Sequence, residues 1–279
     1  MQESLSFCFE PVAIYRSAAK YPYEAPRQGV YAKLPGTVEF PDEPRYHTAL
    51  ADLEGFDRIW LIFVFDQAIR KDAWNPLVAP PLTAGKPHYG VFSTRSPHRP
   101  NPIGMSCVKL LEIKGNVLTV SESDLLSGTP ILDVKPYIPA VDSFPNAAAG
   151  WRDHVDETPW KVIYSDDAQK AMTFIRQLSG LDLENFCHVQ LCFDPLNRKR
   201  KRLSQQGHDL FLHCRTWKIK IIPDEETVQA LVLCPTRELV IQTTEELTNV
   251  AKFKRGQGAQ NGSVHRSVFH VQPSGLHAE

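Results

Sequence analysis

Residues 93–104 form the part of this chain best suited to hold a ligand. Their sequence, Ser-Thr-Arg-Ser-Pro-His-Arg-Pro-Asn-Pro-Ile-Gly, places three prolines within six residues. Because proline fixes its own φ and restricts the preceding residue, such a loop loses little conformational entropy on binding. It carries four polar side chains, those of Arg95, His98, Arg99 and Asn101. We expect a rigid ligand-binding loop; the alternative is a stiffened connector whose arginines are only solvated.

A second cluster, residues 124–137, places two carboxylates beside a turn. Asp124 and Asp133 flank Gly128-Thr129-Pro130, a sequence that must turn the chain and free backbone groups for a ligand. Either carboxylate could accept hydrogen bonds from an adenine amine or a ribose hydroxyl, or act as a general base. The alternative is that both only stabilise the turn.

Two shorter polar segments stand where a ligand could be held. Residues 26–31 form a loop bounded by Pro and Gly that contains Arg27 and Gln28. Asp66 and Gln67 follow the most apolar segment of the chain, at a position where the rim of a barrel carries ligand contacts. Strand ends are also polar for solvation alone.

The elements that must position these residues are short and rich in Val, Ile, Phe and Tyr, which is typical of strands. They are residues 7–15, 58–66, 90–94, 105–113 and 117–124. Lys-Gly-Asn at residues 114–116 predicts a hairpin turn. Since no run of 10–15 helical residues separates the strands, the fold class is mainly β: a single-sheet antiparallel β-barrel, with a short helix at residues 44–53.

The pattern changes after Trp151. Ser165 is suited to cap a helix whose apolar residues recur at helical spacing until Gly180. We expect a second helix at residues 183–193 and a strand at residues 213–222. The predicted domains are a barrel over residues 1–155, a small α+β C-terminal domain over residues 160–223, and a C-terminal extension over residues 224–279, mobile beyond about residue 252.

Charge is distributed unevenly along the 279 residues. The net charge is −1, but residues 1–160 carry 15 Lys and Arg against 19 Asp and Glu, and the remainder carries 16 against 13. The balance is therefore −4 in the first part and +3 in the second. Five consecutive cations, residues 198–202, supply much of that excess. Such a run is either a solvated loop or a contact to phosphates, so a nucleic-acid partner is not excluded.

Several classes of protein are excluded by missing motifs. The sequence has no GxGxxG after a strand, no Walker lysine motif, no HExxH and no GxSxG. Its ten histidines are scattered, so we expect no metal. No apolar run reaches 18 residues, the amino terminus lacks signal-peptide features, and the six cysteines form no CxxC pair. We therefore expect no membrane association and a cytoplasmic location.

Five ordered motifs between Phe9 and Trp151 make the chain resemble the TrmO family (YaeB or TsaA-like proteins). They are Ile-Tyr-Arg-Ser at 14–17 with Pro-Arg-Gln at 26–28, Trp-Leu-Ile-Phe-Val-Phe at 60–65, Gly-Val-Phe-Ser-Thr-Arg-Ser at 90–96, Arg-Pro-Asn-Pro-Ile-Gly-Met-Ser at 99–106, and residues 124–137. The resemblance continues more weakly to about residue 222. It implies a tRNA methyltransferase that uses S-adenosylmethionine on a β-barrel.

The resemblance also implies which residues bind the cofactor. They are Arg27, Gln28, Gly29, Asp66, Gln67, Arg95, Met105, Gly128, Thr129, Pro130 and Ile131. In that family the methyl group goes to N6 of the threonylcarbamoylated adenosine 3′ of the anticodon of threonine tRNA. Candidates for assisting proton removal are Asp124, Asp133 and His98. Family members hold the cofactor near a dimer interface, which implies a homodimer.

Two other functions remain open from the sequence. A non-catalytic RNA-binding or adaptor barrel would use the same loops to bind S-adenosylmethionine as a regulator. A helicase-related fragment is suggested by residues 228–253, which resemble the Pro-Thr-Arg-Glu-Leu segment of DEAD-box helicases. Because the sequence lacks a Walker motif and an Asp-Glu-Ala-Asp box, we expect no ATP hydrolysis from it.

Overall fold

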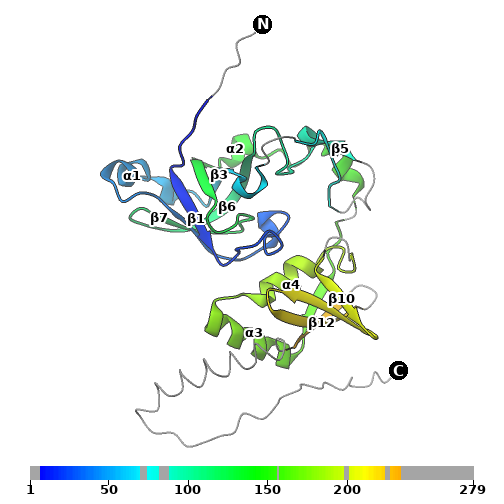
Figure 1. Cartoon of the computed structure of the whole chain (residues 1–279). Helices are drawn as coiled ribbons and strands as arrows, with labels where there is room; N and C mark the ends of the chain where they lie inside the picture. Colours follow the sequence, from blue (N-terminus) through cyan, green and yellow to red (C-terminus); the bar gives the residue numbers. More distant parts are fainter. Residues whose placement is uncertain are drawn as a thin grey trace, which may run out of the picture.

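Six antiparallel strands close into a barrel in the first part of the chain (Figure 1). The computed structural model describes residues 7–69, 74–81, 88–155, 157–197, 201–223 and 227–233. The barrel strands are β1 (Ala13–Ser17), β2 (Gly36–Glu39), β3 (Arg58–Val64), β6 (Ile103–Lys114), β7 (Val117–Ser121) and β8 (Pro130–Pro136). Around the barrel their order is β1-β2-β7-β6-β3-β8. The predicted antiparallel barrel is thus confirmed.

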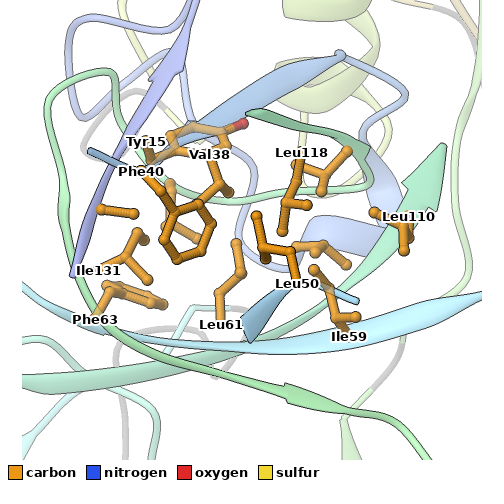
Figure 2. Close-up of a cluster of buried hydrophobic side chains, with 14 residues drawn as sticks. Tyr15, Val38, Phe40, Leu50, Ile59, Leu61, Phe63, Leu110, Leu118 and Ile131 are labelled. Atoms are coloured by element: carbon orange, nitrogen blue, oxygen red, sulfur yellow. The ribbon is translucent and has the colours of Figure 1, made fainter. Parts of the chain in front are cut away.

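Alternation along the strands fills the barrel with apolar side chains. On β3, Ile59, Leu61 and Phe63 point inward and are at most 3% exposed. Figure 2 shows them in one cluster with Tyr15 of β1 and Ile131 of β8. Each fully buried side chain of this kind stabilises the fold by about 1.5–3 kcal/mol. The loops at the barrel ends therefore stand on a rigid base.

Short elements decorate the barrel. The structure gives helices α1 (Pro44–Ala49) and α2 (Pro139–Asp142), the strand pair β4 (Leu77–Val78) and β5 (Tyr89–Gly90), and single 3-10 turns at Gly29–Tyr31, Leu53–Gly55, Asp66–Ala68, Val91–Ser93 and Gly150–His154. The short helix predicted at residues 44–53 is confirmed over its first part. The predicted hairpin at residues 114–116 is also confirmed, with Gly115 at φ +57°.

Two strand predictions need correction. β1 begins at Ala13, so residues 7–12 are not strand. Of residues 90–94, Gly90 ends the short strand β5, and Val91–Ser93 form a 3-10 turn rather than a strand. In that turn the Ser93 hydroxyl donates to the Gly90 carbonyl and the Thr94 hydroxyl donates to the Val91 carbonyl. Such local side-chain bonds compete with a sheet ladder. The sequence analysis also missed β2 and β8.

The second part of the chain forms a five-stranded sheet with two helices (Figure 1). Its elements are β9 (Lys161–Tyr164), α3 (Asp166–Ser179), α4 (Leu183–Leu191), β10 (Leu203–Gln206), β11 (Asp209–Cys214), β12 (Trp217–Pro223) and β13 (Thr227–Leu233). The order is β10-β11-β12-β13-β9, and only β13 and β9 run parallel. This sheet and its helices have a core of their own. Within the described ranges no helix is long and apolar enough to cross a membrane.

The helix predicted between Ser165 and Gly180 is confirmed. The Ser165 hydroxyl caps α3 by accepting from the N–H of Ala168, and Gly180 ends it at φ +69°. The strand predicted at residues 213–222 is instead split by a turn at Arg215, whose φ is +52°. β13 pairs in this sheet although it lies in the region assigned to the C-terminal extension. Residues 234–279 lie outside the described residues, and the domain limits stay a prediction.

Candidate functional site

Strand register gathers the predicted ligand residues at one end of the barrel. Val64, the last residue of β3, pairs with Ile103 at the start of β6, and Phe63 pairs with Ile131 at the start of β8. Asp66 and Gln67, which follow β3, therefore lie at the same end as the turn at residues 128–131. Both side chains are exposed there.

The loop that contains Arg27, Gln28 and Gly29 reaches the same end of the barrel. Gly29 lies so close to the Glu122 carbonyl that an added Cβ would overlap it. The Oε1 atom of Gln28 accepts a hydrogen bond from Nη1 of Arg95 at 2.9 Å. The structure thus joins two loops that are 67 residues apart and were predicted separately as ligand loops.

Asp124 lies beside this loop pair, at the mouth of the barrel. Its Oδ1 accepts a hydrogen bond from the Ser106 hydroxyl at 2.5 Å. Ser106 faces inward on β6 and is buried. Burial raises the pKa of Asp124, while the Ser106 hydrogen bond and the charge of Arg95 lower it. A carboxylate whose pKa is raised is a better base than an exposed aspartate.

Asp133 does not join Asp124. A β-bulge next to Phe63 shifts the register, so that Asp133 pairs with Ile62 on the outer face of the barrel. There the Asp133 carboxylate lies 2.8 Å from the Lys135 ammonium. Met105 pairs with Ile62 from the other side, so it shares this outer face and is 53% exposed. The structure therefore separates the two carboxylates that the sequence placed together.

The remaining predicted positions differ in what they offer a ligand. Ile131 is fully buried in the barrel core and Thr129 is 6% exposed, so they present backbone rather than side chain. Gly128 takes φ +99°, a value that favours glycine, and donates its N–H to the Tyr15 carbonyl. His98 is exposed, with its N–H donating to the Ser96 hydroxyl.

A cavity of about 750 Å³ opens beside the Arg95 and Gln28 pair. Its charged lining residues within the described ranges are Arg27, Arg95, Arg152 and Glu157. The volume lies in the range of small-molecule sites, about 300–1,000 Å³. Glu157 accepts from Arg152 at 2.7 Å and from the Tyr31 hydroxyl at 3.4 Å. A net positive lining of this size suits an anionic ligand.

Part of the cavity wall was not predicted from the sequence. Phe92, Trp151, Arg152 and Glu157 line the cavity, and Ser106 holds the buried carboxylate. Phe92 lies in the motif at residues 90–96 and Ser106 in the motif at residues 99–106, but neither was predicted as a site residue. Phe92 directly precedes the proline-rich loop in the sequence, whereas only the structure brings Trp151 to it.

The prediction that residues 198–202 form a solvated loop or a phosphate contact needs correction at Lys201. Lys201 is 7% exposed, and burial, aided by the charge of Arg27, lowers its pKa to about 8. The Arg202 guanidinium lies 4.3 Å from the centroid of the Tyr23 ring. Lys201 therefore faces the protein and is not part of a solvated loop, whereas Arg202 stays exposed beside Tyr23. Residues 198–200 lie outside the described residues.

The residues at this end of the barrel fit S-adenosylmethionine by their chemistry. Arg95 offers a guanidinium for the carboxylate of an amino-acid moiety, and Gln28 offers an amide for polar groups. Gly128 keeps the backbone open to close approach, because a Cβ added there would meet nothing within 4 Å. The described residues contain no cluster of three or more His, Cys, Asp or Glu able to hold a metal ion. The expectation of no metal stays a prediction.

Comparison with known proteins decides the family. Residues 14–143 match the family model described as the tRNA-methyltransferase O N-terminal domain. The chain is 35% identical over 202 residues to the tRNA (adenine(37)-N6)-methyltransferase of Escherichia coli, covering 70% of this chain and 85% of that protein. The chain belongs to the tRNA-methyltransferase O family.

Other relatives of the tRNA-methyltransferase O family agree with this assignment. A probable S-adenosyl-L-methionine-binding protein of Pyrococcus abyssi is 44% identical over 148 residues, which are 53% of this chain and 77% of that protein. A crystal structure of TrmO from P. aeruginosa superposes with a TM-score of 0.63 at 27% identity. That match covers 85% of this chain and all of the solved chain, so it includes both the barrel and the C-terminal domain.

Proposed function

We propose that this protein methylates N6 of the threonylcarbamoylated adenosine 3′ of the anticodon in threonine tRNA. Membership in the tRNA-methyltransferase O family makes it an S-adenosylmethionine-dependent tRNA adenine-N6 methyltransferase. Beyond this activity, we propose threonine tRNA and the threonylcarbamoylated base as the substrate. It follows from the motif resemblance.

The observation that carries the proposal is that Asp124 and the pair of Arg95 and Gln28 lie at one end of the barrel. Gly29, the neighbour of Gln28, touches the Glu122 carbonyl two residues before Asp124. The Arg95 charge acts on the Asp124 carboxyl, and Arg95 also bonds Gln28 of the Pro-Arg-Gln loop. A base and a binding site for an anionic cofactor group thus lie at the same end of the barrel. Such proximity converts a bimolecular step into an effectively unimolecular one.

For this methyl transfer the protein must mainly align the two reactants and remove one proton. When bound, S-adenosylmethionine supplies an electrophilic methyl group, and its sulfur keeps the electron pair of the broken C–S bond. The N6 nitrogen forms the new N–C bond and must lose its single proton. We assign that proton to the Asp124 carboxylate, which the Ser106 hydroxyl orients at 2.5 Å. The carbamoyl group withdraws electrons from N6, which makes its proton more acidic.

Arg95 and the loop of Arg27, Gln28 and Gly29 are assigned to the cofactor. The Arg95 guanidinium binds its carboxylate, and the turn at residues 128–131 offers backbone groups. Asp66, Gln67 and Met105 belong to the same assignment. His98 and Asp133 are the less suitable bases, since Asp133 is paired with Lys135 on the outer face.

The protein is further proposed to act as a cytoplasmic homodimer. Ile103, Met105 and Val141 are 42%, 53% and 61% exposed on or beside the outer face of β6, where a second copy would cover them. A dimer would place Met105 against a cofactor held between two copies. A sedimentation experiment that gives a monomer with full activity would contradict this assembly.

One assay separates the enzyme from the adaptor barrel. The protein is incubated with labelled S-adenosylmethionine and threonine tRNA, with and without the threonylcarbamoyl group. Transfer only to the modified tRNA supports the proposal, whereas binding without transfer supports the adaptor. The Asp124→Asn variant is the control, because it should bind the cofactor and lose turnover. Equal methyl transfer to other tRNAs that carry the same modified base would contradict the proposed specificity for threonine tRNA.

A further inference from the structure

Two pairs of aromatic side chains surround the 3-10 turn Val91–Ser93 at the edge of the cavity. The rings of Trp74 and Phe92 lie 6.1 Å apart between centroids, and those of Tyr89 and Trp151 stack at 4.7 Å. Phe92 is 73% exposed and Trp74 is 46% exposed. Leaving such rings in water is unfavourable, so they indicate a surface that is covered when the protein works.

Hydrogen bonds and burial fix the turn that carries Phe92. Val91, the first residue of the turn, is buried, and its N–H donates to the Pro76 carbonyl at 2.9 Å. The indole Nε1 of Trp151 donates to the Ser93 carbonyl at 2.8 Å. The Ser93 hydroxyl in turn donates to the Gly90 carbonyl. A ring mounted this way loses little entropy on binding a flat partner.

Positive charge lies next to the exposed rings. Phe92 and Trp151 line the same cavity as Arg27, Arg95 and Arg152, against the single carboxylate of Glu157. The first 160 residues carry a balance of −4, so this lining reverses the charge of the barrel around it. Aromatic faces interleaved with arginines are the combination that binds single-stranded nucleic acid, because bases stack and phosphates pair with guanidinium groups.

We propose that Phe92, with Trp74 beside it, forms a stacking surface for an unpaired base that flanks the target adenosine in the anticodon loop. This inference rests on the proposed function. Arg95 joins the surface to the cofactor loop through Gln28, so a base stacked on Phe92 would be held near Asp124. RNA duplexes offer no exposed base faces, so the surface selects a loop over a stem. The other occupant of such a patch, a second copy of this chain, is an outcome of the test.

The test uses the full chain and a synthetic anticodon stem-loop RNA with 2-aminopurine at a position next to the target adenosine. Stacking on Phe92 predicts a fluorescence change on binding that Phe92→Ala removes. The same variant should bind the RNA roughly tenfold to hundredfold more weakly, as for loss of one base–aromatic stack. Phe92→Tyr should keep both the fluorescence change and the RNA affinity. Phe92→Leu, which is apolar but not aromatic, should lose both.

Controls separate this inference from general damage and from the proposed function. Phe174→Ala removes an aromatic ring that is 51% exposed on α3 of the C-terminal domain, and it should leave RNA affinity unchanged. Wild-type protein that stacks the RNA but transfers no methyl group would sink the proposed function and leave this inference standing. Unchanged RNA affinity in Phe92→Ala overturns the inference, and a changed oligomeric state without that loss assigns the patch to a second copy.

Discussion

The carboxylate of Glu24 is held by the guanidinium of Arg215, which donates from Nε to Oε1 at 2.7 Å and from Nη2 to Oε2 at 3.0 Å. Glu24 is 5% exposed, and its Oε2 also accepts from the backbone N–H of Lys20 and Tyr21. Arg215 stands in the turn between β11 and β12. This pair therefore fastens the C-terminal domain to the segment that leads into the loop of Arg27.

Breaking this pair should destabilise the protein strongly. Arg215→Ala leaves the Glu24 carboxylate buried without its cation, a change that costs about 3–5 kcal/mol. Urea unfolding followed by circular dichroism measures the loss. Arg45→Ala is the matched control, because Arg45 pairs with Glu43 at 2.7 Å with its side chain 73% exposed. That variant should change stability by less than about 1 kcal/mol. Equal losses in the two variants would contradict the role of the Glu24 pair.

Arg95 should be required for cofactor binding. Arg95→Ala removes the guanidinium assigned to the carboxylate of S-adenosylmethionine and the bond to Gln28. A charged hydrogen-bond partner is worth about 1.5–3 kcal/mol, so we expect affinity in calorimetry to fall roughly tenfold to hundredfold or beyond detection. Arg176→Ala on α3, far from the cavity lining, should bind as the wild type does. Wild-type affinity in Arg95→Ala would sink the assignment.

Gly29 should tolerate no side chain. An added Cβ would overlap the Glu122 carbonyl, so Gly29→Ala must displace the loop that carries Arg27 and Gln28. We expect weaker cofactor binding by about tenfold or more, with the barrel still folded, since steric displacement of this kind costs about 1–3 kcal/mol. Gly55→Ala is the control, because its Cβ would meet nothing within 4 Å. A Gly29→Ala protein with normal cofactor affinity would show that the loop is not used.

The Ser106 hydroxyl should set the acid limb of the pH profile. Its hydrogen bond stabilises the ionised form of Asp124 and so lowers the pKa of that carboxyl. Ser106→Ala removes the bond, the pKa rises, and the base becomes protonated at a higher pH. The acid limb of kcat should therefore move upward by about one unit, while Ser106→Thr, which keeps a hydroxyl, stays near the wild type. An unmoved limb argues against Asp124 as the base.

Lys201 should make stability depend on alkaline pH. Burial lowers the pKa of Lys201 from 10.5 to about 8, so between these values the unfolded chain holds a proton that the folded chain has lost. Stability therefore rises with pH across that window. Lys201→Met, which keeps the volume without the charge, should remove this rise in urea midpoints measured at pH 7.5, 9 and 10.5. A difference between the two proteins that is constant with pH would contradict the prediction.

Sequence signals sufficed where the deciding contacts are local. The cap of α3 depends on Ser165 and Ala168, three residues apart, and the hairpin between β6 and β7 depends on Gly115. Prolines made the rigidity of residues 93–104 readable in the same way, because each acts on its own φ and on its neighbour. The barrel followed from strand composition and the missing crossover helices. Family motifs added the proposed cofactor residues.

Tertiary structure alone decided which of these residues meet. Asp124 and Asp133 are similar in sequence context, but a bulge turns Asp133 outward, while the register of β6 brings Ser106 to Asp124. Glu24 and Arg215 are 191 residues apart, and no periodicity indicates their pairing. Lys201, expected in solvent with its basic neighbours, is buried. The reason is physical: strand register and domain docking depend on closing the whole chain, and this information is not present in any local window of residues.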